Sequence, residues 1–378
     1  MKNICRVCGH VLGAKALLSF NNMPKSAQNF PDADSLSQDK GENLDIFGCP
    51  GCGLAQLTVL PVPYYREVIR AAAFSEEMRT FRHKQFGHFV KKYRLKGRKV
   101  LELGCGRGEY LSIMKRQGVK AYGLEYSKPA VDCCKSMELN VERGYLSTGS
   151  KPLKNGPFDA FYIMNFLEHF PDPKSGLEAM GDNLRSGGIG LVEVPNFDMI
   201  IRKQLFSEFI KDHLLYFTKD TLETALKLSG FEVLESKVVW HDYIISSVVK
   251  KRELPVLDSF YDSFQKIKKE LTAFLGKHRK GRVAVWGASH QALAVMALAE
   301  LAGKISYVVD SASFKQGKFT TATHIPIVSP ELLDLQPVSA IIIMAASYSD
   351  EVARIIKKKY GKKIKTAILR DYGLEIKN

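Results

Sequence analysis

The sequence predicts an α/β protein built around a doubly wound, mainly parallel sheet, with a zinc-binding module before it and a smaller α/β domain after it. Short apolar segments alternate with helical ones from Lys99 to about Lys251, and a second alternation starts at Arg282. Two Cys-x-x-Cys pairs precede both. We therefore expect a zinc-binding module, a central sheet domain, and a linker helix with a C-terminal α/β domain, at residues 1–64, 65–255 and 256–378.

The zinc-binding module is predicted from two cysteine knuckles, Cys5-Arg-Val-Cys8-Gly and Cys49-Pro-Gly-Cys52-Gly. Each knuckle can present two thiolates to one metal, and the glycine after the second cysteine permits a tight turn. Four thiolates in a tetrahedron suit Zn²⁺ and leave no position open for a substrate, so the metal should be structural. His10 could replace one cysteine. The remainder of residues 1–58 is rich in turn formers and is expected to be irregular.

Helical periodicity from about Tyr65 to Tyr93 leads into the central domain. The strands of this domain are short apolar runs separated by helical segments, and the last two runs look like a closing pair. They are Lys99–Leu103, Ala121–Glu125, Ala160–Asn165, Gly190–Val194, Phe231–Ser236 and Tyr243–Val249. Such an alternation is typical of a parallel sheet with helices on both faces.

The most informative segment is the loop after the first of these strands, which carries Gly104, Gly106 and Gly108 just before a helix. Glycines allow the backbone to turn sharply and to approach a ligand closely. Their spacing alone would also fit a dinucleotide-binding fold.

Carboxylates around this loop favour a different ligand. Glu102 stands near the end of the first strand, and Glu125 closes the next strand 19 residues after Gly106, where a carboxylate can bind both ribose hydroxyls. The helix begins with Glu109, whose negative charge is unfavourable beside a pyrophosphate. An adenosine that carries a methionine fits this loop better than a dinucleotide does.

A second, smaller α/β unit is expected after a charged helix from Leu257 to about Lys280. Its strands are predicted at Arg282–Gly287, Ile305–Asp310, Ala340–Ala345 and Lys365–Leu369.

Composition limits the function classes. An apolar fraction of 45% and a charged fraction of 25% are typical of a globular protein, and no apolar stretch is long enough for a membrane span. The N-terminus lacks the apolar core of a signal peptide, so we expect a cytoplasmic protein with reduced thiols. The net charge of +15 could indicate nucleic-acid binding, but the lysine-rich stretch near residue 357 ends a predicted helix and favours a solvated surface. An acidic substrate such as a sugar diphosphate would also suit this charge.

Two motifs resemble those of class I S-adenosylmethionine-dependent methyltransferases, which have a Rossmann-like core. They are Glu102-Leu-Gly-Cys-Gly-Arg-Gly108 and Asn165-Phe-Leu-Glu-His-Phe-Pro-Asp-Pro173. The order of the cysteine pairs, these motifs, Asp212-His-Leu-Leu-Tyr-Phe217 and a C-terminal block that includes His324-Ile-Pro-Ile327 resembles nucleotide-sugar C-methyltransferases, which make branched deoxysugars. The resemblance extends over almost the whole chain.

This resemblance implies S-adenosylmethionine as cofactor, bound by Glu102, Gly104, Gly106, Glu125, Tyr126 and Asn165. Residues 143–147, which correspond to the third-strand region of the family, lack the carboxylate that many relatives offer to adenine. A backbone contact or packing by Tyr145 is expected to replace it.

The resemblance also implies methyl transfer to C-3 of a nucleotide-linked 4-keto-deoxysugar through an enolate. Such chemistry needs a base with a pKa near neutrality and a donor for the enolate oxygen. His213 is the expected base and His169 the second candidate, since both follow strands whose carboxyl ends should face the cofactor. Asp212 or Glu168 is expected to orient the base, and Tyr64 is a weaker candidate for the substrate pocket.

Departures from the family pattern leave other reactions open. Relatives show Tyr-x-Glu-His where this chain has Ile210-Lys-Asp-His213, and a Pro-Gly where it has Thr320-Thr-Ala-Thr-His324. A sugar O- or N-methyltransferase is therefore an alternative. An RNA methyltransferase with a zinc knuckle is a weaker one, because no aromatic and basic single-strand platform is visible. Of these alternatives, a non-catalytic binding module is the least favoured, because the glycine loop for the cofactor is intact. We expect a nucleotide-sugar substrate, no membrane or nucleic-acid partner, and a monomer or small homo-oligomer.

Overall fold

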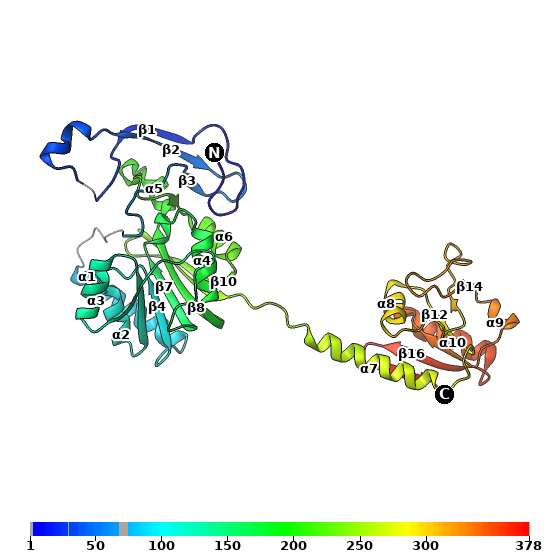
Figure 1. The fold of residues 1–378 in the computed structure, drawn as a ribbon. Coiled ribbons are helices and arrows are strands. Elements are labelled where there is room, and N and C mark those ends of the chain that lie inside the picture. Colours follow the sequence, from blue (N-terminus) through cyan, green and yellow to red (C-terminus); the bar gives the residue numbers. More distant parts are fainter. Residues whose placement is uncertain (1–2, 29, 68–74, 378) are drawn as a thin grey trace. The chain divides into compact units, whose positions relative to one another are not determined.

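The computed structural model describes residues 3–28, 30–67 and 75–377, and the chain forms two compact units, residues 1–253 and 254–378 (Figure 1). Separation of the first unit into a module and a central domain stays a prediction, because both belong to one compact unit. Of the helices in these three ranges, none has both the length and the apolar character that a membrane span requires.

The first unit begins with a small antiparallel sheet of order β1-β2-β3-β9. Its strands are β1 (Leu18–Met23), β2 (Glu42–Gly48), β3 (Ala55–Leu57) and β9 (Leu215–Tyr216). The expectation of irregular structure over residues 1–58 is therefore wrong. In β2, Leu44 and Ile46 are buried and Asp45 between them is exposed. This alternation of buried and exposed side chains is typical of a half-buried strand. A 3-10 turn, η1 (Ala33–Gln38), lies between β1 and β2.

The central sheet has seven strands in the order β10-β11-β8-β7-β4-β5-β6, and the expected doubly wound fold is confirmed. Strands β8, β7, β4, β5 and β6 run parallel, and β11 and β10 close the sheet as an antiparallel pair. Their bounds are β4 (Lys99–Leu103), β5 (Lys120–Glu125), β6 (Asn140–Arg143), β7 (Phe158–Met164), β8 (Leu184–Pro195), β10 (Phe231–Val239) and β11 (Ile244–Lys251).

Helices cover both faces of this sheet. The side chains of β4 alternate, so that Val100 packs with the apolar residues of α1, α2 and α3, whereas Leu101 packs with those of α4 and α6. The helices of the first unit are α1 (Glu76–Lys92), α2 (Glu109–Arg116), α3 (Lys128–Ser136), α4 (Pro173–Asp182), α5 (Phe197–Lys203) and α6 (Lys219–Leu228). Of these, α5 packs against the N-terminal sheet.

The first helix starts later than its periodicity predicts. Ser75 is its N-cap and accepts a hydrogen bond from the Met78 backbone N–H (3.1 Å). Tyr65 instead lies in a turn, which is closed by a hydrogen bond from the Tyr65 backbone N–H to the Val62 carbonyl (3.0 Å). The intervening residues 68–74 of the predicted helix lie outside the described ranges.

The second unit is another α/β sheet, of order β14-β13-β12-β15-β16-β17, parallel except for β17. Its helices are α7 (Asp258–Leu275), α8 (His290–Leu298), α9 (Leu332–Leu335) and α10 (Ser349–Tyr360). Its strands are β12 (Val283–Trp286), β13 (Val308–Val309), β14 (Ile327–Val328), β15 (Ala340–Ile343), β16 (Lys365–Arg370) and β17 (Gly373–Lys377). The four predicted strand regions are confirmed, and β14 and β17 are additional.

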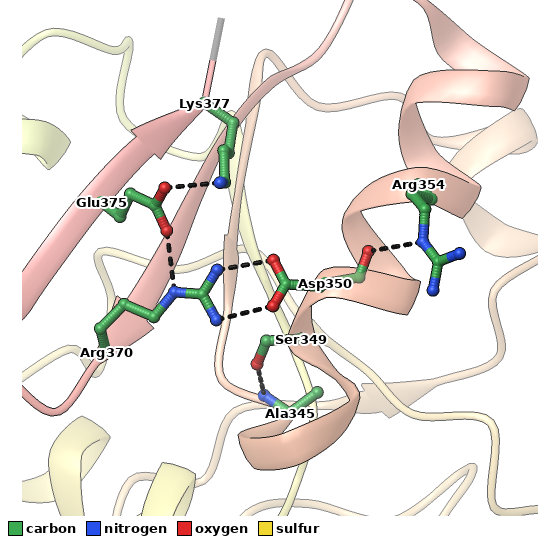
Figure 2. Close-up of polar contacts among 7 residues, drawn as sticks. All are labelled: Ala345, Ser349, Asp350, Arg354, Arg370, Glu375 and Lys377. Carbon is green, nitrogen blue, oxygen red and sulfur yellow. Dashed lines mark hydrogen bonds and ion pairs between the residues drawn. The ribbon is translucent and has the colours of Figure 1, made fainter.

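A polar network joins the β16–β17 hairpin to α10 (Figure 2). Arg370 donates two hydrogen bonds to the Asp350 carboxylate (2.9 and 2.6 Å) and one from Nε to Glu375 (2.8 Å). Lys377 pairs with the other oxygen of Glu375. Bidentate pairing of a guanidinium fixes orientation as well as distance, so the network holds the edge hairpin against the start of α10.

Candidate active site and cysteine cluster

The two cysteine knuckles meet at one point of the first unit. The sulfur atoms of Cys5 and Cys52 lie 3.6 Å apart, those of Cys8 and Cys49 lie 3.5 Å apart, and all four fall within 4.8 Å of one another. None of these four cysteines forms a disulfide. With Zn–S bonds of about 2.3 Å, a tetrahedron needs sulfurs roughly 3.8 Å apart, so the arrangement fits one zinc ion. His10 is not a member of this group of potential ligands.

The glycine loop leaves the carboxyl end of β4 with left-handed backbone at each glycine. At Gly104 (φ 66°), a Cβ atom would lie 2.5 Å from the ring of Phe166. At Gly108 (φ 87°), which caps α2, it would lie 2.5 Å from Leu139. Larger residues at either position would clash, so these glycines are required by packing as well as by conformation.

Glu125 ends β5 and ties the loop to the next strand. One carboxylate oxygen accepts a hydrogen bond from the Gly106 backbone N–H (2.9 Å), and the other accepts one from Ser127 (2.8 Å). Burial raises the pKa of Glu125 above its usual value, while these two N–H groups oppose the shift. Each oxygen keeps a lone pair for a further donor such as a ribose hydroxyl.

A pocket with aromatic walls lies at the same edge of the sheet. Gly104 and Tyr126, both predicted cofactor residues, line it together with Arg66, Leu103, Leu124, Gly144, Tyr145, Leu146, Phe166 and Phe170. Tyr145 thus forms part of the wall of this pocket, and its packing against adenine stays a prediction.

The other four predicted cofactor residues, Glu102, Gly106, Glu125 and Asn165, do not line this pocket. Glu102 is fully buried in the sheet and accepts a hydrogen bond from the Tyr162 hydroxyl (2.9 Å). Asn165 follows β7 with left-handed backbone (φ 51°), a conformation that asparagine tolerates, and its N–H donates to the Glu193 carbonyl (2.9 Å). Asn165 thus turns the chain at the carboxyl edge of the sheet, beside the glycine loop.

The candidate catalytic residues gather at the next turn, η2 (Leu167–His169). The rings of His169 and His213 meet edge to face with centroids 4.8 Å apart, and nitrogen or oxygen atoms of Glu168, His169 and His213 all lie within 4.8 Å of one another. His169 Nδ1 lies 2.7 Å from the Asp212 carbonyl, and the Leu214 N–H donates to the Glu168 carbonyl (2.9 Å). These contacts hold residues 212–214 against η2.

The position of His213 differs from the expected one. It does not directly follow a strand of the central sheet, but lies between η3 (Phe206–Glu208) and β9, which belongs to the N-terminal sheet. Pairing of β9 with β3 brings His213 to the cluster.

Burial makes all three members of the cluster neutral at pH 7. It lowers the pKa of His169 to about 4 and that of His213 to about 3, and it raises the pKa of Glu168 to about 8. Neither histidine therefore has the pKa near neutrality that is expected of the base. Glu168 is instead a protonated acid, and its second oxygen is buried without a hydrogen-bond partner within the described part of the chain. Sequence reasoning gave Glu168 no role as an acid, because only its complete burial indicates one.

The carboxylate of Asp212 does not orient a histidine. It accepts hydrogen bonds from the Tyr64 hydroxyl (2.6 Å) and the Ala27 N–H (3.1 Å), and only the backbone carbonyl of Asp212 contacts His169. Burial, followed by the contact with Asp212, raises the pKa of the Tyr64 hydroxyl. Tyr64 and Asp212 therefore join the N-terminal segment to the cluster.

Comparisons with known proteins agree with this architecture. A family model described as a methyltransferase domain matches residues 74–236, and one described as a C-methyltransferase C-terminal domain matches residues 248–368. The C-methyltransferase NovU of Streptomyces niveus is 23% identical over 385 residues, which cover 92% of this chain and 90% of NovU. The ubiquinone biosynthesis O-methyltransferase of Alkalilimnicola ehrlichii is 33% identical over 99 residues, 25% of this chain and 40% of that protein.

Two solved methyltransferase structures are also similar to about half of this chain. An S-adenosylmethionine-dependent methyltransferase from Clostridium acetobutylicum is 14% identical, with a TM-score of 0.38 over 50% of this chain and 96% of that one. The plantazolicin methyltransferase BpumL, in complex with SAH and a substrate analogue, is 16% identical, with a TM-score of 0.38 over 46% of this chain and 85% of that one. From the two matching domains and the similarity to NovU along nearly its whole length, the chain is a class I S-adenosylmethionine-dependent C-methyltransferase.

Proposed function

We propose that this enzyme methylates C-3 of a nucleotide-linked 4-keto-deoxysugar. The observation that supports this most is the meeting of two imidazole rings and one carboxyl group at η2, with nitrogen and oxygen atoms of Glu168, His169 and His213 within 4.8 Å of one another. Removal of a proton beside a ketone needs an unprotonated base and a donor for the enolate oxygen, and the group offers both. The sugar and its C-3 rest on the sequence resemblance, and the net charge of +15 suits a diphosphate.

In this proposal His213 is the base, with His169 as the second candidate. The C–H bond next to the carbonyl breaks, its proton passes to an imidazole nitrogen, and its electron pair forms the enolate. Burial keeps the free imidazole unprotonated, and the enolate that forms beside the ring then favours imidazolium, because opposite charges attract strongly where water is excluded. The protonated carboxyl of Glu168 would donate a hydrogen bond to the enolate oxygen.

The cofactor would lie along the ends of β7, β4 and β5. Asn165 and the glycine loop would face its methionine end, with Glu102 beneath the loop, while Glu125 would bind the ribose and Tyr126 the adenine. When bound, S-adenosylmethionine supplies the electrophilic methyl group that the enolate carbon takes up. The aromatic walls of the pocket would exclude water from this region.

We also propose that the four cysteines hold one Zn²⁺ ion. The spacing of their sulfurs supports this, and the four thiolates leave no position for substrate. The metal would connect the turn at Cys5 to the turn at Cys49, on either side of β1 and β2.

Product analysis tests the proposed reaction. The enzyme would be incubated with S-adenosylmethionine and a panel of nucleotide-linked 4-keto-deoxyhexoses, and the product examined by NMR. We expect a methyl group on the carbon next to the ketone. A methyl group on oxygen or nitrogen would contradict the proposal and support the alternative acceptors. If every sugar in the panel is left unmethylated, the sugar assignment is wrong.

A further inference from the structure

A guanidinium group occupies the aromatic pocket at the cofactor edge. Arg66 lines this pocket, and its guanidinium carbon lies 5.1, 5.4 and 4.9 Å from the ring centroids of Tyr65, Tyr126 and Tyr145. Planar guanidinium groups stack on aromatic faces in the way that a flat base does. The space that remains in the pocket is about 10 Å³, room for one water molecule and far too small for a purine.

The order of the strands indicates which part of the cofactor would lie in this pocket. If Glu125 at the end of β5 binds the ribose, the adenine must lie farther toward β6, since β4, β5 and β6 are consecutive in the sheet. Tyr126 follows β5 directly, and Tyr145 follows β6 after one glycine. The guanidinium carbon of Arg66 lies 5.4 and 4.9 Å from the centroids of these two rings.

Arg66 is held in the pocket by contacts that can be exchanged. Its guanidinium is hydrogen-bonded to the side chains of Tyr126 and Tyr65, whereas its Nε is buried without a hydrogen-bond partner among the described residues. By contrast, Arg82 is paired with the buried carboxylate of Glu193. The backbone beside Arg66 is fixed, because Tyr64 is bonded to Asp212 and the Glu67 N–H donates to the Tyr64 carbonyl (2.7 Å). Rotation of the side chain alone would empty the pocket.

We propose that Arg66 is a placeholder for the adenine ring, which has to displace the guanidinium when the cofactor binds. Arg66 then sets the affinity of the enzyme for every adenosine-containing ligand by competing for the space beside Tyr126 and Tyr145. This inference rests on the placement of the cofactor under Proposed function. It predicts that loss of the guanidinium strengthens binding, whereas loss of a residue that contacts the cofactor weakens it.

Calorimetry with S-adenosylmethionine and with SAH tests this role. In Arg66→Ala, both ligands should bind roughly 2- to 30-fold more tightly, the fold-change that corresponds to one cation–π contact. Arg66→Gln keeps the aliphatic part of the chain and should show the same direction. Arg143→Ala is the matched control, since that guanidinium lies 5.9 Å from the Tyr126 ring and donates to the Tyr126 carbonyl (3.1 Å) but does not line the pocket.

The outcomes separate this inference from the proposed function. Weaker or unchanged binding of SAH in Arg66→Ala would overturn the placeholder role. Tighter binding of S-adenosylmethionine alone, in both Arg66→Ala and Arg143→Ala, would also overturn it, because charge repulsion of the sulfonium would then explain the change. If Glu125→Ala binds both ligands as the wild type does, the cofactor placement itself is wrong.

Discussion

Replacement of Glu168 by glutamine should stabilise the first unit at neutral pH and do so more strongly as the pH rises. The side chain is 2% exposed, and burial raises its pKa from 4.5 to about 8. A carboxyl with a raised pKa stays protonated in the folded state while the unfolded chain loses its proton above pH 4.5, so folding loses stability between pH 4.5 and pH 8. Glutamine cannot ionise and removes this penalty.

The size of the effect follows from the same values. At pH 7 the unfolded carboxyl is ionised and the folded one is still mainly protonated, which corresponds to about 3 kcal/mol of lost stability. At pH 5 the same reasoning gives less than about 1 kcal/mol. Glu168→Gln should therefore gain about 3 kcal/mol over the wild type at pH 7 and little at pH 5.

Urea unfolding at a series of pH values would measure this difference. The chain has two tryptophans, and Trp240 belongs to the first unit whereas Trp286 belongs to the second. In a Trp286→Phe background, Trp240 fluorescence follows the first unit alone. The matched control is Glu178→Gln on α4, an exposed carboxylate 3.6 Å from Lys174, which should change stability by less than about 0.5 kcal/mol. A gain in Glu168→Gln that does not grow between pH 5 and pH 7, or a loss of stability at pH 7, would refute the protonated state of Glu168.

Two further predictions concern the ligands. Glu125→Ala should weaken S-adenosylmethionine binding by about 1–3 kcal/mol, because charged hydrogen bonds to the ribose are lost, and calorimetry with an unchanged Kd would show that the ribose contact is misplaced. Protein purified without chelator should contain one zinc ion per chain by elemental analysis, and stripping the metal should disorder the knuckles, since structural zinc sites contribute roughly 10–16 kcal/mol in small peptides. Absence of stoichiometric metal would contradict the zinc site.

The sequence was sufficient to predict features that depend on local patterns. The central strands appear as apolar runs, and the glycine loop appears in its spacing, because both are properties of consecutive residues. The cysteine knuckles could also be predicted, because the two cysteines of each pair are close in sequence. In the structure the four sulfurs converge.

Features that depend on contacts between distant residues were missed. The N-terminal sheet is completed by Leu215–Tyr216, which pair with Ala55–Leu57. No local pattern indicates such a pairing. Asp212 was expected to orient a histidine because they are neighbours in sequence, yet its carboxylate is bonded to Tyr64. Glu168 is protonated because the whole fold buries it, and the spacing of residues along the sequence does not predict that burial.

Solvent deuterium exchange at the sugar carbon tests the central claim, that His213 removes a carbon-bound proton, most directly. The wild-type enzyme with S-adenosylmethionine or SAH should exchange the proton next to the ketone of a nucleotide-linked 4-keto-deoxysugar. His213→Ala should slow this exchange by about 10²–10⁴-fold while its Kd for SAH stays unchanged. Exchange at the full rate in His213→Ala would assign the base elsewhere, with His169 the next candidate. Methyl transfer by a wild-type enzyme that exchanges no carbon-bound proton would contradict carbon as the acceptor.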